Sequence, residues 1–149
     1  MVVRKLAEMG AEIRVHDPYV EHWYELETQE TYPSEGHSWS RFFRNQDELV
    51  NIRTSKDLPG SLKGVEALVL AVPHKEYLQL DPEQVVAWVG EPLAVIDCFG
   101  ILSDEAIRKY FELGCEVKAL GRGHVQTIKK LVEAKMSDNP VNKNVLENV

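Results

Sequence analysis

Glu-Ala-Leu-Val-Leu-Ala-Val-Pro-His, residues 66–74, is the stretch of the sequence that decides the fold. The residues from 67 to 72 are all apolar, and Pro73 ends the run. A short apolar run rich in Leu and Val is typical of a strand buried on both faces inside a parallel sheet. Because parallel sheets bind ligands at the carboxyl ends of their strands, we expect function in the turn that holds His74 and Tyr77.

Strands and helices alternate along the rest of the chain. Helices are predicted at 1–9, 82–89, 104–112 and 124–136, a turn or short helix at 55–64, and strands at 11–16, 49–53, 93–96 and 115–120. Asp81 and Ser103 are the predicted N-caps of the helices at 82–89 and 104–112. Gly10 ends the first helix, and Gly114 ends the helix that Ser103 begins. The alternation predicts an α/β layer structure with a mostly parallel sheet.

The first elements form only the second half of a β-α-β unit, namely a helix, Gly10, a short strand and Asp17. The strand and Gly-rich turn that would precede the helix are not in the sequence. We therefore predict a Rossmann-like domain of three layers whose first strand is missing. Asp17 stands where a dinucleotide-binding fold places the acid that holds the ribose hydroxyls, but an Asp before Pro is also an ordinary turn residue. Both interpretations remain open.

Composition sets limits on the class of protein. The chain has 149 residues, 44% of them apolar, and a net charge of −7. These values predict one soluble domain over 1–136, with a long aromatic insertion at about 21–48 and a polar tail at 137–149. The acidic charge argues against nucleic-acid binding, and no apolar run is long enough for a membrane span or a signal peptide. We expect a cytoplasmic protein, because two cysteines make no disulfide framework.

Catalytic and metal sites find little support in the sequence. The five histidines lack metal-ligand spacing, so no metal is predicted. Cys98 follows a predicted strand and lies beside Asp97, which makes a nucleophile conceivable. No histidine is placed by the sequence to activate it, and a structural cysteine is the commoner outcome. We predict no catalytic residue in this chain.

Arg122 lies between two glycines after the last predicted strand. The glycines allow close backbone approach, and a guanidinium can form paired hydrogen bonds to a phosphate. A solvated arginine in a flexible turn would have the same sequence, so both interpretations stay open. The aromatic residues of the insertion could stack on a base or a partner, but we favour a role in anchoring a long loop.

Four segments in register carry a resemblance to a known family: 6–20 (LAEMGAEIRVHDPYV), 63–77 (KGVEALVLAVPHKEY), 95–102 (VIDCFGIL) and 114–123 (GCEVKALGRG). Together they resemble the C-terminal, UDP-binding domain of the UDP-glucose/GDP-mannose dehydrogenase family. The resemblance implies an enzyme that oxidises the C6 hydroxyl of a nucleotide sugar to a carboxylate in two NAD-dependent steps, for polysaccharide precursor synthesis. It leans toward enzymes of the UDP-N-acetyl-D-mannosamine type.

In such enzymes an N-terminal Rossmann domain binds NAD, and the nucleophilic cysteine also lies upstream of the C-terminal domain. The resemblance therefore implies that this chain binds a UDP-sugar. It also implies that the chain binds no NAD and carries no complete active site. A missing N-terminal and central part, or a homo-oligomer, is the expected partner. The alternatives are a stand-alone nucleotide-binding or interaction module and a fragment of an NAD-binding Rossmann domain.

The nucleotide-binding candidates are His74, Asp97, Phe99, Gly100 and Arg122. Two departures from the family pattern concern this site. The family's Phe-Lys and Thr-x-Asp-x-Arg stretch would lie upstream of residue 1, and Phe99 stands where the family often has an arginine. The latter puts a direct charge contact at that position in doubt.

The resemblance also gives the apolar run at 67–72 a place in the sheet. In a sheet of order 3-2-1-4-5-6 it is strand 4, and its missing neighbour is strand 1. We expect an edge whose unpaired buried backbone groups each cost about 1–3 kcal/mol. The expected fold is marginal, and it closes the gap, recruits another chain or aggregates.

Overall fold

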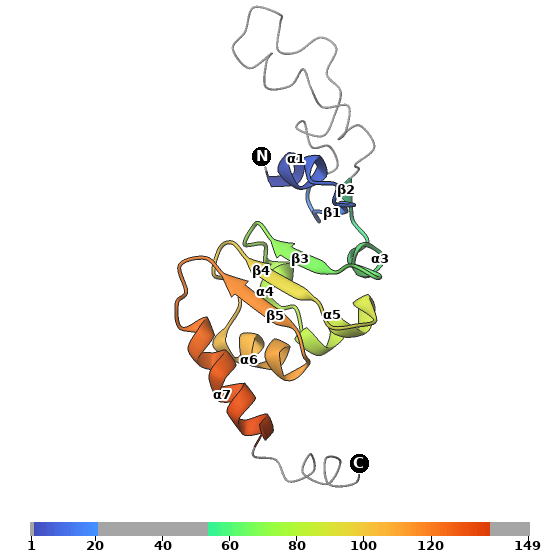
Figure 1. Ribbon diagram of the computed structural model, residues 1–149. Coiled ribbons are helices and arrows are strands. Elements are labelled where there is room, and N and C mark those ends of the chain that lie inside the picture. Colours follow the sequence, from blue (N-terminus) through green and yellow to red (C-terminus); the bar gives the residue numbers. More distant parts are fainter. Residues whose placement is uncertain (1, 21–53, 138–149) are drawn as a thin grey trace, which may run out of the picture. The chain divides into compact units, whose positions relative to one another are not determined.

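A computed structural model of the chain describes residues 2–20 and 54–137, which form two compact units that meet in the sequence between Ser61 and Leu62 (Figure 1). The elements in chain order are α1 (Val2–Glu8), β1 (Val15–His16), β2 (Thr54–Ser55), α3 (Leu58–Leu62), β3 (Ala67–Leu70), α4 (Lys75–Leu78), α5 (Pro82–Val89), β4 (Ala94–Asp97), α6 (Asp104–Glu112), β5 (Glu116–Ala119) and α7 (Val125–Ser137). No helix in these ranges is long and apolar enough to cross a membrane.

The first unit contains α1 and a two-stranded parallel sheet. Helix α1 ends as predicted at Gly10, which has a φ of 85° and donates its N–H to the carbonyl of Ala7. Strand β1 pairs with β2 through Val15 and His16 only. The strand predicted at 11–16 is thus mostly irregular, because β2 offers a partner for its last two residues alone. The predicted strand at 49–53 and the insertion predicted at about 21–48 lie outside the described residues.

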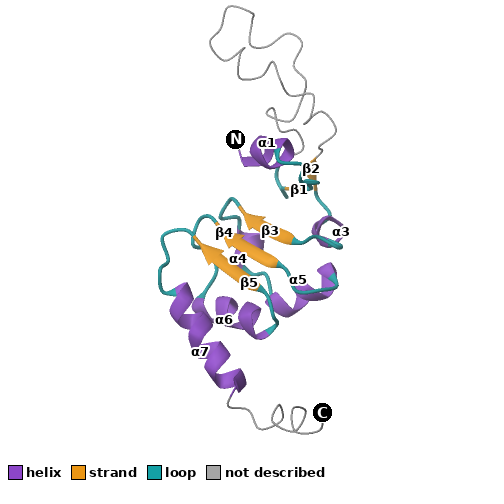
Figure 2. Cartoon of the chain, viewed as in Figure 1, coloured by secondary structure: helices purple, strands orange, loops and turns teal. Residues whose placement is uncertain are grey.

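The second unit is built on a parallel sheet of order β3-β4-β5 (Figure 2). Ala67 pairs with Ala94, which in turn pairs with Glu116, so the three strands start level with one another. This confirms the α/β class, the parallel pairing and the predicted neighbour order of these strands. The predicted three-layer arrangement depends on how the two units are placed relative to each other. It therefore stays a prediction.

Two helices of this unit begin where the sequence predicts. The side chain of Asp81 accepts the N–H of Glu83 at the start of α5, and Ser103 accepts the N–H of Ala106 at the start of α6. Each cap satisfies a backbone donor that the first helical turn leaves unpaired. Helix α6 packs against α5 and α7, and α7 also contacts β5. These helices bury their apolar faces in the core.

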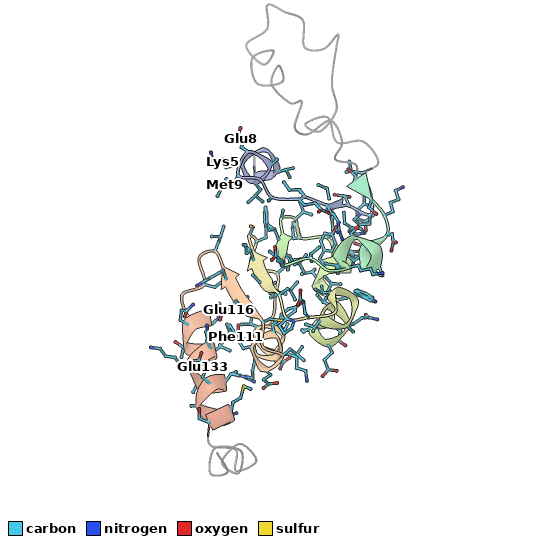
Figure 3. All side chains as sticks on the ribbon, turned by 45° about the vertical axis from the view of Figure 1, so that its right-hand side comes forward. Lys5, Glu8, Met9, Phe111, Glu116 and Glu133 are labelled. Atoms are coloured by element: carbon cyan, nitrogen blue, oxygen red, sulfur yellow. The ribbon has the colours of Figure 1, made fainter. Side chains whose placement is uncertain are left out.

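The core lies between the sheet and these helices. Its completely buried side chains are Val85, Val95, Ile107, Tyr110 and Val117. The hydroxyl of Tyr110 has no hydrogen-bond partner among the described residues, and burial raises its pKa well above the ordinary range. At the surface of α7, Lys129 pairs with Glu116 of β5, and its Nζ lies 5.9 Å from the ring centroid of Phe111. Figure 3 labels Phe111 and Glu116, the two partners of this lysine. The contact joins α6, β5 and α7.

The structure corrects the prediction for the strand at 67–72. It was expected to be buried on both faces, but Leu70 is its only buried residue, and Ala67 is exposed. The reason is position, because β3 is the outer strand of its sheet and, among residues 2–20 and 54–137, pairs with β4 alone. The short helix α4 was not predicted separately from the turn, since four residues are too few to show a helical period.

Candidate functional site

The carboxyl ends of β3, β4 and β5 lie at one edge of the sheet. Asp97 is the last residue of β4, and the other four candidates lie in the segments that follow these strands. Backbone hydrogen bonds continue the ladder just past the strands. Cys98 donates its N–H to the carbonyl of Leu70, and Leu120 donates to the carbonyl of Asp97, both at 3.0 Å. The loops that leave the three strands therefore start from a fixed, level edge.

Asp97, the last residue of β4, is completely buried. Its Oδ1 accepts the N–H groups of Phe99 and Ile101, each at 3.1 Å, and its Oδ2 accepts the N–H of Leu102 at 3.0 Å. A buried carboxylate is stable when backbone donors surround it in this way, and each charge-assisted bond is stronger than a neutral one. Asp97 thus fixes the path of the loop after β4 and is a positioning residue for the candidates that follow it.

This loop presents Phe99 to solvent. The side chain of Phe99 is 61% exposed although its backbone N–H is bound to Asp97. The next residue, Gly100, has a φ of 68°, a conformation that residues with a Cβ rarely adopt. A Cβ at this position would lie 3.6 Å from Cδ of Arg122. The result is an aromatic ring on a fixed loop, with Gly100 of this loop beside the side chain of Arg122 from the turn after β5.

The side chain of Arg122 reaches back from the turn after β5 to the loop after β4. Its Nη1 donates to the carbonyl of Leu102, and its Nη2 donates to Oδ1 of Asp104. The side chain is only 20% exposed. Arg122 is therefore not a freely solvated arginine, and its contact with a phosphate stays a prediction.

Two residues that the sequence did not single out complete this cluster. Nε2 of His124 lies 3.0 Å from Oδ1 of Asp104 and 3.3 Å from Nη2 of Arg122. The hydrogen bond with His124, together with the nearby positive charges, lowers the pKa of Asp104 against a weaker opposing effect of desolvation. His124 could have been found from its place two residues after Arg122. Asp104 could not, because it looks like an ordinary acid in the first turn of a helix.

His74 lies at the same edge but after the outer strand, β3. It is the N-cap residue of α4, without a side-chain cap hydrogen bond, and its carbonyl accepts the N–H groups of Tyr77 and Leu78. Its ring centroid is 5.6 Å from that of the buried Tyr77. The structure thus places Gly100 close to Arg122 and His74 at the other end of the same edge.

The remaining sequence candidates have structural roles. Oδ1 of Asp17 accepts the N–H groups of Tyr19 and Val20, as the ordinary turn interpretation predicts. Both cysteines are free, Cys98 half-buried and Cys115 buried, and burial raises the pKa of the Cys115 thiol. Within residues 2–20 and 54–137, no group of three or more His, Cys, Asp or Glu side chains could hold a metal ion.

A parallel sheet with helices between its strands defines this unit as an α/β protein, a class in which ligands commonly bind beyond the strand ends. Residues 1–104 match the model of the UDP-glucose/GDP-mannose dehydrogenase family, UDP binding domain. The chain belongs to this family. The match includes His74, Asp97, Phe99 and Gly100, whereas Arg122 lies beyond it. Neither the curated proteins nor the solved structures contain a match.

Proposed function

We propose that this chain is the nucleotide-sugar-binding part of an NAD-dependent UDP-sugar 6-dehydrogenase, which oxidises the C6 hydroxyl of the sugar to a carboxylate. The family match carries the proposal, because it covers most of the chain and names a UDP-binding domain. The edge of the β3-β4-β5 sheet supports it with a defined place for the ligand. The sugar is an N-acetylhexosamine in our proposal, in keeping with the resemblance of the first segment.

The residues at this edge divide the recognition of UDP between them. Arg122 supplies the positive charge for the diphosphate, and Gly100 lets the ligand approach the loop backbone. Phe99, which stands in place of an arginine, offers its exposed ring to the flat face of uracil. Asp97 fixes the loop, and His74 provides a polar group at the far end of the edge. UDP is thus held by one charge contact and one stacking contact.

The oxidation itself needs groups that we assign to other parts of the enzyme. The described residues do not fit NAD, which would supply the hydride acceptor of such a reaction. The turn of Asp17 uses the carboxylate that would have to meet the ribose. We therefore assign NAD and the cysteine nucleophile to an N-terminal part in the same enzyme. The chain alone, in this proposal, forms no NADH from NAD and a UDP-sugar.

Calorimetric titration of the full chain with UDP tests the binding role. We expect UDP to bind and ADP to bind more weakly, and we expect Phe99→Ala to weaken UDP binding. Leu131→Ala is the matched control, because Leu131 is a comparably exposed apolar residue on α7 and should leave binding unchanged. Absence of UDP binding, or equal effects of the two variants, would contradict the proposed site. NADH formation by the purified chain would contradict the assignment of NAD and the cysteine nucleophile to another part of the enzyme.

A further inference from the structure

Arg122, His124 and Asp104 form a surface cluster, which we call the 104–122–124 cluster, in which two basic groups face one carboxylate oxygen. Nη2 of Arg122 and Nε2 of His124 both contact Oδ1 of Asp104. The side chains of Asp104 and His124 are 55% and 49% exposed. The carboxylate thus occupies Nη2 of Arg122 and Nε2 of His124 on the solvent side of the cluster. A phosphate oxygen would need the same two nitrogens.

The position of the Arg122 guanidinium has a second, independent support. Its Nη1 donates to the carbonyl of Leu102, whose N–H is in turn bound to the buried Asp97. The stem of the side chain lies beside Gly100. Since these contacts involve the loop after β4 and not the carboxylate, the guanidinium stays in place when Asp104 moves away. Asp104 itself is free to turn, because its half-exposed side chain stands at the start of α6, where a negative charge is favourable with or without the arginine.

We propose that Asp104 is an internal competitor of the ligand, a carboxylate that occupies the phosphate position on Arg122 and His124 until a nucleoside diphosphate displaces it. This inference rests on the proposed function and adds a regulatory element to the same site. Nη2 of Arg122 donates to one oxygen of Asp104, and a guanidinium N–H donates to a phosphate oxygen in the same way, so one anion can replace the other at this nitrogen. The lowered pKa of Asp104 means that the carboxylate is fully charged at neutral pH and competes at full strength.

A purely structural role for Asp104 predicts the opposite behaviour. If the carboxylate only ties the turn after β5 to α6, removing its charge loosens the cluster and weakens the binding of a ligand there. If Asp104 competes with the ligand, removing its charge strengthens binding. The sign of the change in affinity therefore separates the two roles, whatever its size.

The test is calorimetric titration of the full chain and of Asp104→Asn with UDP, with inorganic pyrophosphate and with uridine. We expect Asp104→Asn to bind UDP and pyrophosphate about three- to tenfold more tightly, as the loss of one or two partly exposed ion-pair contacts implies. Uridine, which has no phosphate, should bind both proteins equally. Asp104→Ala should show the same direction as Asp104→Asn.

Glu105→Gln is the matched control, because Glu105 is exposed on the same helical turn and takes no part in the cluster. It removes the same charge and should change the affinity for UDP by less than about twofold. Equal or weaker binding of UDP by both Asp104 variants would overturn the inference, and so would an equal gain in Glu105→Gln. If the wild-type chain binds UDP but the variants show no gain, the inference alone fails. If no protein binds UDP or pyrophosphate, the proposed function fails with it.

Discussion

Replacing Asp97 with Asn tests whether one buried carboxylate organises the candidate site. Asn keeps Oδ1, which accepts the N–H groups of Phe99 and Ile101, and has an NH₂ group in place of Oδ2. The N–H of Leu102, which is bound to Oδ2 in the wild-type chain, then faces this NH₂ group. A buried donor without an acceptor costs about 1–3 kcal/mol, and the two remaining bonds lose their charge assistance at about 1 kcal/mol each. A neutral amide is cheaper to bury than a carboxylate. We therefore expect the second unit to lose about 2–4 kcal/mol of unfolding free energy.

Urea unfolding followed by far-ultraviolet circular dichroism measures this loss, and hydrogen exchange locates it. The amides of Phe99, Ile101 and Leu102 should exchange faster in the variant than in the wild-type chain. Asp81→Asn is the control, because Asp81 is an exposed N-cap and Asn caps a helix as well as Asp does. If Asp97→Asn is within about 0.5 kcal/mol of this control and the three amides keep their protection, the assigned role of Asp97 is refuted.

Four further outcomes follow from the core, the α6 cap and the two cysteines. Tyr110→Phe should raise the unfolding free energy by about 1 kcal/mol, because it removes a buried hydroxyl without a partner, and a loss of stability in urea would contradict this. Ser103→Ala should cost about 1 kcal/mol through loss of the α6 cap, and an unchanged urea midpoint would show that the cap is unimportant. Cys98 should react with iodoacetamide before Cys115 in mass spectrometry, and simultaneous labelling would argue against the described burial. Folding raises the pKa of the Cys115 thiol. Its contribution to the unfolding free energy is therefore complete below the ordinary thiol pKa of about 8.5 and is lost as the pH rises above that value. An unfolding free energy that increases from neutral to alkaline pH would contradict this.

The sequence predicted the second unit well because its local signals agree with its packing. Asp81 with Pro82 and Ser103 with Asp104 marked helix starts that the structure confirms, and short apolar runs marked β3, β4 and β5. Each signal depends on residues a few positions apart, so it survives without knowledge of the tertiary structure. The parallel order of the strands followed from the alternation of strand and helix.

The predictions failed where a distant partner decides the outcome. The burial of β3 depends on which strands flank it, and the length of β1 depends on the extent of β2. The same holds for the candidate site. Asp97 and Arg122 lie at or after strand ends as predicted, and their role in binding stays a prediction. The sequence could not tell that Asp97 turns inward or that Asp104 meets Arg122 from 18 residues away.

Titration of the isotope-labelled full chain with UDP, followed by amide chemical shifts, tests the central claim most directly. The claim predicts shift changes in the loops at 98–102 and 120–124, at the carboxyl ends of β4 and β5. The opposite ends of the strands provide an internal control, because Gly64, Gly90 and Gly114 precede β3, β4 and β5 and should not respond. Changes confined to those glycines, or no changes at saturating UDP, would contradict a nucleotide site at the carboxyl edge of this sheet.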